Sequence, residues 1–557
     1  MKNRQTLSAV LLTALVAVLA YLGISRGPVE RPSALALGQA PSVETVRPLA
    51  VQPGQTTRLV FTGKNLANAA SLWTSFPSST VPVSDDLAKG NRAAFDVTVP
   101  LDIPVQIGAV RLASPKGIGA FRLLMVDDLP NLAEVSGNES RERAQFVAGP
   151  ISVDGIGNGT QLDWFEFEAS KNEAISFEVI ANRLGSNFDS AVRVYEASGR
   201  LLASFGDSPG IAPDLQFRHR FNKTGRYFLR LRDMAYAGGR GSFFRLRVGD
   251  FPIVSGVFPQ GNKRGEFKPF YPISKQSLPP VLAMPVGAEI WLNFKLPNGV
   301  GSAYRRLAVG EAPNAYDAEP NDMLSQANEI NLPSAINGRF EKTGDRDWYA
   351  VELAKGDRVR FTGATRTLGS PCDLMLRVTD AAGETLAESK ITGDSDGEVS
   401  AEAKSDGVHY LEVRELAEQA GEHLVYRIEA ERVQSGFTLT IAEHAFTAKA
   451  DEPFSVKVTA TRNKYDAPIQ LQLEGVENEM KIEGATIAKG KKETTLKITP
   501  PADAKPGTLY SFSITGKGEN GSTAVSTQTN ESLLKQFRLM TPFPTVLRSK
   551  LHATIIE

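Results

Sequence analysis

Apolar and polar residues alternate with a period of two through much of this chain, as they do in β-strands that bury one face. In the segment DWFEFE at 163–168, both phenylalanines fall on one face, while Trp164 and the glutamates fall on the other. Leu229 and Leu231 alternate with arginines in the same way. The pattern predicts short strands in sheets that each pack one face against a core.

One block of this pattern occurs twice. Residues 163–165 (DWF) recur at 347–349 (DWY), an offset of 184 positions (347 − 163 = 184). Residues 225–232 recur at 407–414 with an offset two positions shorter, as expected if a loop between the strands lost two residues. Neither copy keeps an apolar period of 3.6 residues through three helical turns. We therefore expect two all-β modules of related structure.

The chain of 557 residues is too long for one hydrophobic core and predicts several domains. Its 48 glycines and 33 prolines favour short strands and many turns. The predicted fold class is all-β, with tandem β-sandwich modules after an N-terminal apolar segment. The expected order is a signal peptide or membrane anchor (1–27), a sandwich of immunoglobulin-like size (43–128), the first repeat copy (129–250), a degraded sandwich or structured linker (251–315), the second copy (316–433), an immunoglobulin-like sandwich (437–529) and an unassigned tail (530–557).

The N-terminus has the pattern of an export signal. Lys2 and Arg4 precede an uncharged run from Leu7 to Ile24, which is long enough either to be cleaved as a signal or to remain as a membrane anchor. Cys372 is the single cysteine, so no disulfide can form within the chain. An exported protein without disulfides is typical of a bacterial envelope. We expect the remainder in the periplasm, at the cell surface or outside the cell.

The overall charge excludes some partners. The 62 basic and 63 acidic residues nearly cancel, so the composition predicts neither nucleic-acid binding nor electrostatic docking on a membrane. A membrane contact is expected only through the N-terminal segment, if that segment is retained.

An acidic cluster in the second copy is the strongest candidate site. Four oxygen-bearing side chains lie within six residues, and Pro320 restricts the backbone between them. Two further aspartates, at 345 and 347, sit before a strand, where a loop can bring them alongside. Ca²⁺ takes six to eight oxygen ligands, and carboxylates with an Asn carbonyl supply them. A solvated acidic linker, with aspartates capping turns, is the alternative. The candidate metal ligands are Asp317, Glu319, Asn321, Asp322, Asp345 and Asp347.

Three motifs of the second copy occur in order, at 317–322 (DAEPND), 344–349 (GDRDWY) and 368–373 (LGSPCD). In these motifs the chain resembles the bacterial pre-peptidase C-terminal (PPC) domain, a jelly-roll-like sandwich usually appended to secreted hydrolases. The resemblance covers both copies and implies calcium at the acidic positions. Segments 61–66 and 257–265 resemble IPT/TIG-like sandwiches, which alternate with PPC modules in exported multi-domain proteins of planctomycete-type bacteria.

The first copy has lost part of the acidic cluster. It keeps Asp163, but Gln161 stands where the second copy has Asp345, and the segment 133–137 lies near the position of the Glu-Pro-Asn-Asp motif. We expect the first copy to bind calcium weakly or not at all, so calcium is predicted for the second copy only.

Motifs of enzymes are absent or unconvincing. The glycines of GKGENG at 516–521 fit the dinucleotide fingerprint on paper, but β-prone residues follow them, so a hairpin turn is expected. The sequence contains no H-E-x-x-H pair and no G-x-S-x-G elbow. A triad built from scattered positions stays open, because triads are recognised by geometry. We predict no enzymatic activity and no catalytic residues.

Three other residues invite a functional interpretation, and for each a structural role is favoured. Trp164 and Trp348 fall on the outward face at a strand start, where packing under a loop is favoured over stacking on a sugar or peptide. Cys372 corresponds to Phe188 of the first copy, which favours a small buried side chain over a reactive thiol. His409 aligns with the inward Tyr227 and is expected in the core.

Together these features predict an exported, non-enzymatic protein for binding, adhesion or spacing at the cell envelope, with a calcium-stabilised second PPC module. Its partner would be an unidentified protein or polysaccharide at the cell surface. The alternative is an accessory or targeting subunit of a secreted peptidase or other hydrolase.

Overall fold

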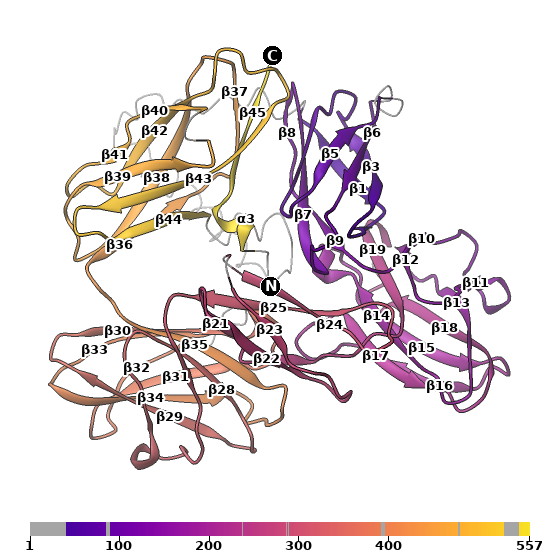
Figure 1. Ribbon diagram of the computed structural model, residues 1–557, viewed down its shortest axis with the longest axis horizontal. Helices are drawn as coiled ribbons and strands as arrows, with labels where there is room; N and C mark the ends of the chain where they lie inside the picture. The colour runs from indigo at the N-terminus through magenta and orange to yellow at the C-terminus, as the bar shows by residue number, and fades with distance from the viewer. Residues whose placement is uncertain are drawn as a thin grey trace, which may run out of the picture. The chain divides into compact units, whose positions relative to one another are not determined.

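The structure, a computed structural model, describes almost the whole chain beyond residue 39 (Figure 1). Nearly all regular structure in this part is strand, with short 3-10 turns and the four-residue helix α3 (Val546–Ser549), so the all-β prediction is confirmed. No helix within it is both long and apolar enough to span a membrane. The predicted signal or anchor lies outside the described residues. These are 40–84, 90–236, 238–285, 287, 289–390, 396–476, 479–528 and 545–557.

The first sandwich has a four-stranded sheet in the order β1-β3-β6-β5 and a second sheet in the order β2-β9-β7-β4, with β8 paired to β7. Leu59, Phe61 and Phe95 belong to the core between them. The strands are β1 (Ser42–Arg47), β2 (Ala50–Val51), β3 (Thr56–Lys64), β4 (Ser71–Thr74), β5 (Ser79–Pro82), β6 (Arg92–Thr98), β7 (Gln106–Ser114), β8 (Gly117–Ile118) and β9 (Arg122–Val126).

The first repeat copy also consists of two sheets, in the orders β10-β12-β19-β14-β17 and β11-β13-β18-β15-β16. The predicted alternation is present: Phe165 and Phe167 are buried in the core, and Trp164 is on the other face of the strand. The strands are β10 (Asn131–Ala133), β11 (Gln145–Phe146), β12 (Ile151–Asn158), β13 (Asp163–Ala169), β14 (Ala174–Ile180), β15 (Ser190–Glu196), β16 (Leu201–Phe205), β17 (Leu215–Arg220), β18 (Gly225–Asp233) and β19 (Gly238–Gly249).

The second copy repeats this topology strand for strand, in the orders β26-β28-β35-β30-β33 and β27-β29-β34-β31-β32. Cys372 is fully buried in its core, as Phe188 is in the first copy. The strands are β26 (Asn314–Tyr316), β27 (Asn328–Glu329), β28 (Ser334–Arg339), β29 (Arg346–Leu353), β30 (Arg358–Ala364), β31 (Leu374–Thr379), β32 (Thr385–Glu388), β33 (Glu398–Glu402), β34 (Gly407–Glu415) and β35 (Val425–Arg432).

The proline-rich stretch between the copies forms a small sandwich of two three-stranded sheets, β20-β22-β23 and β21-β25-β24. Val257, Phe270 and Leu292 belong to its own core. The strands are β20 (Gly256–Phe258), β21 (Gly261–Lys263), β22 (Lys268–Ile273), β23 (Val281–Ala283), β24 (Glu289–Phe294) and β25 (Ala303–Gly310).

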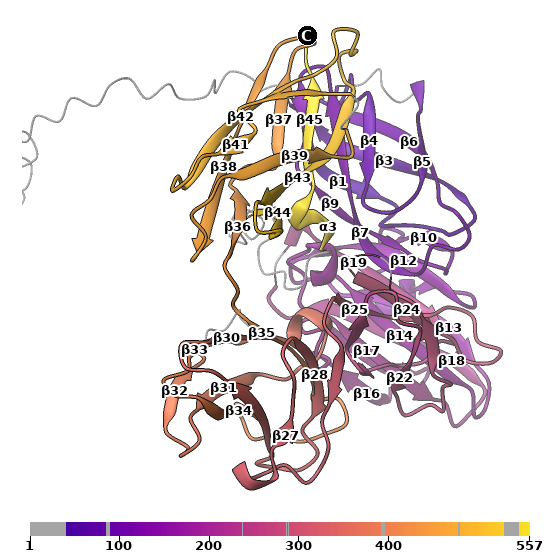
Figure 2. The same ribbon diagram turned by 60° about the vertical axis from the view of Figure 1, so that its left-hand side comes forward.

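The last sandwich takes up the end of the chain as well, because β45 pairs in parallel with β37 and antiparallel with β43 (Figure 2). The glycine motif at 516–521 joins β43 to β44 as the predicted hairpin turn. The strands are β36 (Gly436–Ile441), β37 (Ala445–Ala448), β38 (Phe454–Asn463), β39 (Ile469–Glu474), β40 (Lys481–Glu483), β41 (Thr486–Ile487), β42 (Glu493–Thr499), β43 (Leu509–Gly518), β44 (Thr523–Gln528) and β45 (Leu551–Ile555).

A buried ion network fastens the end of β9 to the first repeat copy. Asp127 follows β9 and accepts from Arg245 at 2.7 Å and from Arg247 at 3.1 Å, both on β19. Arg245 also pairs with Asp154 at 2.6 Å, and Arg247 with Glu178 at 2.6 Å. Arg247 also lies 3.5 Å from Asp128, so every charged group of this network has a partner of opposite sign inside the protein.

Candidate metal centre

The acidic cluster lies where the loop after β26 meets the start of β29. Asp317 directly follows β26, and its N–H donates to the carbonyl of Asn337 on the neighbouring β28 at 2.9 Å. The loop is fixed again at Asn321, whose carbonyl accepts from the N–H of Trp348 at 3.1 Å. Asp347 is the second residue of β29. Sheet pairing therefore brings side chains about thirty positions apart in the sequence to one place.

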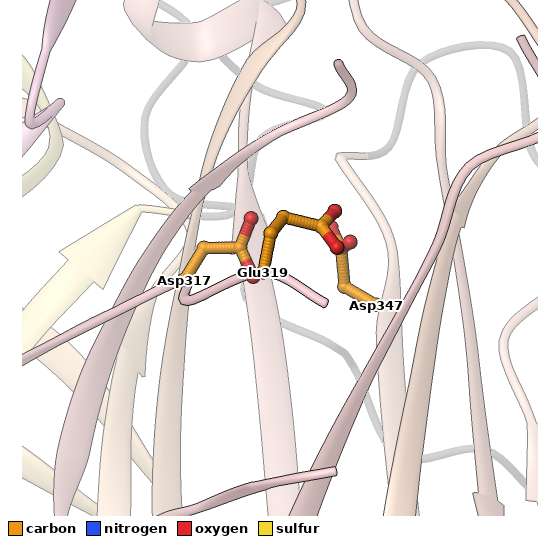
Figure 3. Close-up of side chains that lie close together, drawn as sticks. All are labelled: Asp317, Glu319 and Asp347. Carbon is orange, nitrogen blue, oxygen red and sulfur yellow. The ribbon is translucent and has the colours of Figure 1, made fainter. Parts of the chain in front are cut away.

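The carboxylates of Asp317, Glu319 and Asp347 converge. Each offers an oxygen, and these atoms all lie within 4.8 Å of one another. Figure 3 shows the three side chains close together. Asp347 is fully buried, Asp317 half-buried and Glu319 exposed, so the cluster opens to solvent on the side of Glu319. Oxygens at this spacing can share one cation.

Two buried tyrosines support the aspartates from the core side. Tyr349 on β29 donates its hydroxyl to Asp317 Oδ1 at 3.1 Å, and Tyr426 on β35 donates to Asp347 Oδ2. The two hydroxyls lie 2.7 Å apart. Asn321 Nδ2 also donates to Asp317 Oδ1, at 2.6 Å. These bonds hold one oxygen of each aspartate and leave the other available.

Three buried oxygens of the cluster accept no hydrogen bond within the described part of the chain. They are Oδ1 of Asn321, Oδ1 of Asp345 and Oδ1 of Asp347. Buried polar atoms in folded proteins are nearly always satisfied, so three such acceptors in one place call for a donor or a cation. Lys342 Nζ lies 4.0 Å from Asp345 Oδ1, which is beyond hydrogen-bond distance, so a cation bound among these oxygens is the better match.

The electrostatics point the same way. Burial, followed by the charge of Asp317, raises the pKa of Asp347 well above its usual range. Burial also raises the pKa of Asp317 to about 6, with Glu319 and Asp345 adding to the shift. The pKa of Glu319 is raised too, by burial and then by Asp345. Carboxylates that repel one another in a partly dry site have a strong preference for a positive ion.

The remaining two candidates differ in their positions. Asp345 is buried, and its Oδ2 accepts from the N–H of Glu341 at 2.6 Å, while its Oδ1 accepts no hydrogen bond among the described residues and lies 4.0 Å from Lys342 Nζ; Asp345 is not one of the three converging carboxylates. The structure does not bring Asp322 into the cluster: its carboxylate pairs with Lys342 Nζ at 2.5 Å near the surface. Nothing in the sequence pattern predicts that pair, since Lys342 is twenty positions away.

The first copy retains more of the site than its sequence alignment suggests. Glu134 donates its N–H to the next strand as Asp317 does, and the carbonyl of Asn138 receives the N–H of the strand-start tryptophan as that of Asn321 does. Glu134 and Asn138 are four positions apart, as Asp317 and Asn321 are, and this shared spacing could have revealed the correspondence. The alignment missed it because the chain between this loop and Asp163 differs in length by one residue.

These residues satisfy one another in the first copy. Glu134 Oε1 accepts from Asn138 Nδ2 at 3.0 Å, and Oε2 accepts from the N–H of Ile156 at 3.0 Å. Glu134 also hydrogen-bonds Asp163, whose pKa burial and nearby carboxylates raise to about 8. Both carboxylate oxygens of Glu134 therefore have hydrogen-bond partners, unlike those of Asp347 in the described part of the second copy.

The other residues singled out in the sequence are packed. Trp348 is only 7% exposed and meets Tyr410 edge-on, whereas Trp164 is half-buried against Tyr195. His409 is buried in the second copy, and its Nδ1 contacts the carbonyl of its neighbour Gly407 at 2.9 Å. The predicted structural role fits Trp348 and His409, while Trp164 stays partly open to solvent.

No family model matches the chain, and no curated protein matches it. Among solved structures, it is similar to the pre-peptidase C-terminal domain of collagenase from Bacillus anthracis (16% identity, covering 19% of this chain and 93% of that chain, TM-score 0.16). It is also similar to SGBP-B of the Bacteroides ovatus mixed-linkage glucan utilization locus (10% identity, covering 68% of this chain and 74% of that chain, TM-score 0.14). A third similar structure is a tetra-tandem repeat from a large adhesion protein (9% identity, covering 87% of this chain and 96% of that chain, TM-score 0.11). At such TM-scores these similarities assign no function, and the tandem sandwich architecture rests on the sheets of this chain.

Proposed function

We propose that this protein is an exported, non-enzymatic array of β-sandwiches that binds or spaces components at the cell envelope, and that one calcium ion stiffens its second repeat copy. The observation that carries the proposal is the set of three buried oxygens that accept no hydrogen bond among the described residues, beside the converging carboxylates of Asp317, Glu319 and Asp347.

The donor set favours calcium over other metals. Asp317, Glu319, Asn321, Asp345 and Asp347 offer only hard oxygen atoms, with no sulfur or imidazole among them. Zinc prefers nitrogen and sulfur ligands in a closed tetrahedron, and magnesium keeps several of its waters. A site with five oxygen-bearing side chains and an open, exposed side suits the six to eight ligands of calcium.

Calcium would act mainly on stability. Without an ion, the carboxylates repel one another between the 317–322 loop and β29, which the structure joins through the N–H of Trp348. An ion would replace that repulsion with attraction. At a free concentration about 100 times its dissociation constant, a ligand that binds only the folded state adds about 2.7 kcal/mol to the free energy of unfolding. The module would then resist opening at the edge where the chain enters it.

The histidines support a non-enzymatic role. His409 is buried against a backbone carbonyl. His552 is also buried, and its Nδ1 lies 3.3 Å from a guanidinium nitrogen of Arg111. A neighbouring cation disfavours the protonated imidazole that a general base must become, and burial and Arg111 lower the pKa of His552 well below its usual value.

Thermal unfolding of residues 40–557 tests the calcium site. The transition of the second copy should rise by several degrees in millimolar calcium relative to chelator, because calcium binds only its folded form. Asp347→Asn should remove the rise, since it deletes a charge at the centre of the cluster. Asp163→Asn, the same substitution at the equivalent position of the first copy, is the matched control and should keep it. If calcium does not change the transition temperature of the unsubstituted protein, the cluster is a solvated acidic loop and not a calcium site.

A further inference from the structure

Three arginines of the first repeat copy gather on the outer face of its β11-β13-β18-β15-β16 sheet. Arg193 on β15 lies directly across from Arg230 on β18, and Arg232 is two positions further along β18, on the same face. All three line a cavity of about 460 Å³ at the surface. Like charges on neighbouring strands destabilise a sheet, so this arrangement is costly unless an anion compensates it.

Aromatic rings hold two of these guanidinium groups in place. Arg230 lies 5.8 Å from the ring centre of Trp164 and 5.7 Å from that of Tyr195. Arg232 lies 5.7 Å from the ring centre of Tyr236 and donates to its hydroxyl at 3.1 Å. Tyr236 is 55% exposed. Stacking on a ring fixes the plane of a guanidinium while leaving its N–H groups free to donate.

None of the three arginines forms an ion pair with a carboxylate among the described residues. Asp189 and Asp207 line the same cavity, and burial followed by the charge of Asp207 raises the pKa of Asp189. The lining thus includes three arginines and two aspartates, and none of the arginines is neutralised by a direct ion pair among the described residues.

The second copy shows what this face looks like when it is neutralised. In the second copy, Glu412 occupies the position of Arg230. It pairs with Trp348 on one neighbouring strand and with Arg377 on the other. It forms ion pairs with Arg377 at 2.5 Å and Arg346 at 3.1 Å, and Arg414 pairs with Glu388 at 3.4 Å. The same fold therefore carries a closed charge network in one copy and an open basic cavity in the other.

We propose that this cavity binds an acidic polysaccharide, with the carboxylate of a uronic acid held by Arg193, Arg230 and Arg232. The guanidinium groups offer the paired N–H donors that carboxylates accept best. Asp189 and Asp207, in the lining of the same cavity, accept hydrogen bonds from sugar hydroxyls. The exposed ring of Tyr236 gives the next sugar an apolar face to pack on.

The presence of both arginines and aspartates in the lining favours a polysaccharide over a nucleic acid. A nucleic acid presents a phosphate at every unit, which Asp189 and Asp207 would repel, and the chain as a whole carries almost no net charge to attract one. A polysaccharide with a uronic acid at alternate sugars offers both the anion and the hydroxyls. This inference supplies the ligand of the proposed envelope-binding function and rests on that function only for access to the cell surface.

Affinity electrophoresis of residues 40–557 in gels that contain hyaluronate, a polymer with a uronic acid at alternate sugars, tests the proposal. Hyaluronate should retard the protein, neutral dextran should not, and added salt should weaken the retardation. Arg230→Glu should lower the affinity about tenfold or more, because it removes a charged donor and neutralises Arg193. The substitution copies the second copy's own glutamate, so the sheet is expected to tolerate it.

Lys171→Glu makes the same change of charge at an exposed turn of the same module, outside the cavity, and should leave retardation unchanged. Asp347→Asn should also leave it unchanged, which separates this site from the calcium site. The proposal is overturned if hyaluronate does not retard the protein, if Arg230→Glu binds as well as the unsubstituted protein, or if oligothymidylate of equal charge binds as tightly as hyaluronate.

Discussion

At the scale of single residues, Asp163 and Asp347 stand at one position of a repeated fold and compensate burial differently. Asp163 shares a hydrogen bond with Glu134, and its pKa rises to about 8, so it is neutral at ordinary pH. Asp347 gives one oxygen to Tyr426 and keeps the other buried without a partner. A proton completes the first arrangement, and a metal ion would complete the second.

The raised pKa of Asp163 predicts how the stability of the first copy depends on pH. The folded state binds a proton that the unfolded state has released above its ordinary pKa of 3.8, so the free energy of unfolding should fall as pH rises from 3.8 to about 8. Asp163→Asn, which keeps a donor toward Glu134, should remove most of that fall and make the copy more stable than the unsubstituted protein at pH 8. Hydrogen exchange of β13 amides at several pH values measures this. Glu168→Gln, at an exposed position of the same strand, should behave like the unsubstituted protein.

Protons should also compete with calcium. Because the folded-state pKa of Asp317 is about 6 and that of Asp347 is well raised, both carboxyls carry protons in acid and must release them to bind an ion. Calcium affinity should therefore be weak near pH 5 and rise steeply through neutral pH, with protons released on binding. Calorimetric titrations in two buffers of different ionisation enthalpy would detect the release. An affinity that is the same at pH 5 and pH 8 would contradict this assignment of the ligands.

At the scale of strands, the buried network around Asp127 predicts which ion pairs matter. Arg245→Met leaves Asp127 and Asp154 without their shared partner inside the protein, and breaking a buried pair costs about 3–5 kcal/mol. Arg226→Met in the same module removes a pair with Glu166 in which the arginine is 62% exposed, and such pairs contribute about 0–1 kcal/mol. Urea denaturation monitored by hydrogen exchange of β12 and β19 compares them. Equal losses in the two variants would show that burial does not set the cost here.

Many features of the strands could be predicted from the sequence. Alternating residues fix which face of a strand is buried, and a repeated alternation implies a repeated topology, as β13 and β29 illustrate. Pairing between distant segments leaves a weaker trace. The tail beyond residue 529 gave no sign that β45 joins β37, about a hundred positions earlier. The cavity of arginines was missed for the same reason: alternation places each arginine outward but does not say which strand lies beside it.

At the site, the sequence located Asp317, Glu319 and Asp347, because acidic residues clustered around a proline and before a strand have few structural uses. It did not predict that Asp322 pairs with Lys342, since surface ion pairs depend on loop geometry. It also missed Glu134 and Asn138 of the first copy, where a one-residue difference in length hid the correspondence.

At the scale of the whole molecule, the proposed role predicts an exported protein without hydrolytic activity. Residues 40–557 should leave casein, gelatin and common polysaccharides intact, since the two buried histidines, His409 and His552, contact a backbone carbonyl and an arginine rather than a nucleophile. Cleavage that one histidine substitution abolishes would contradict that expectation. A reporter active only outside the cytoplasm, fused after residue 40, should give signal, because the charged and apolar pattern before it is that of an export segment. A fused reporter that works only in the cytoplasm would exclude export.

The stoichiometry of calcium binding tests the central claim most directly. Titration of chelator-treated residues 40–557 by isothermal calorimetry should show one calcium per chain, lost in Asp347→Asn and in Glu319→Ala, and retained in Asp163→Asn. That result would place the ion among the unpartnered oxygens of the second copy. Two equivalent ions per chain, or no binding at neutral pH, would contradict the account.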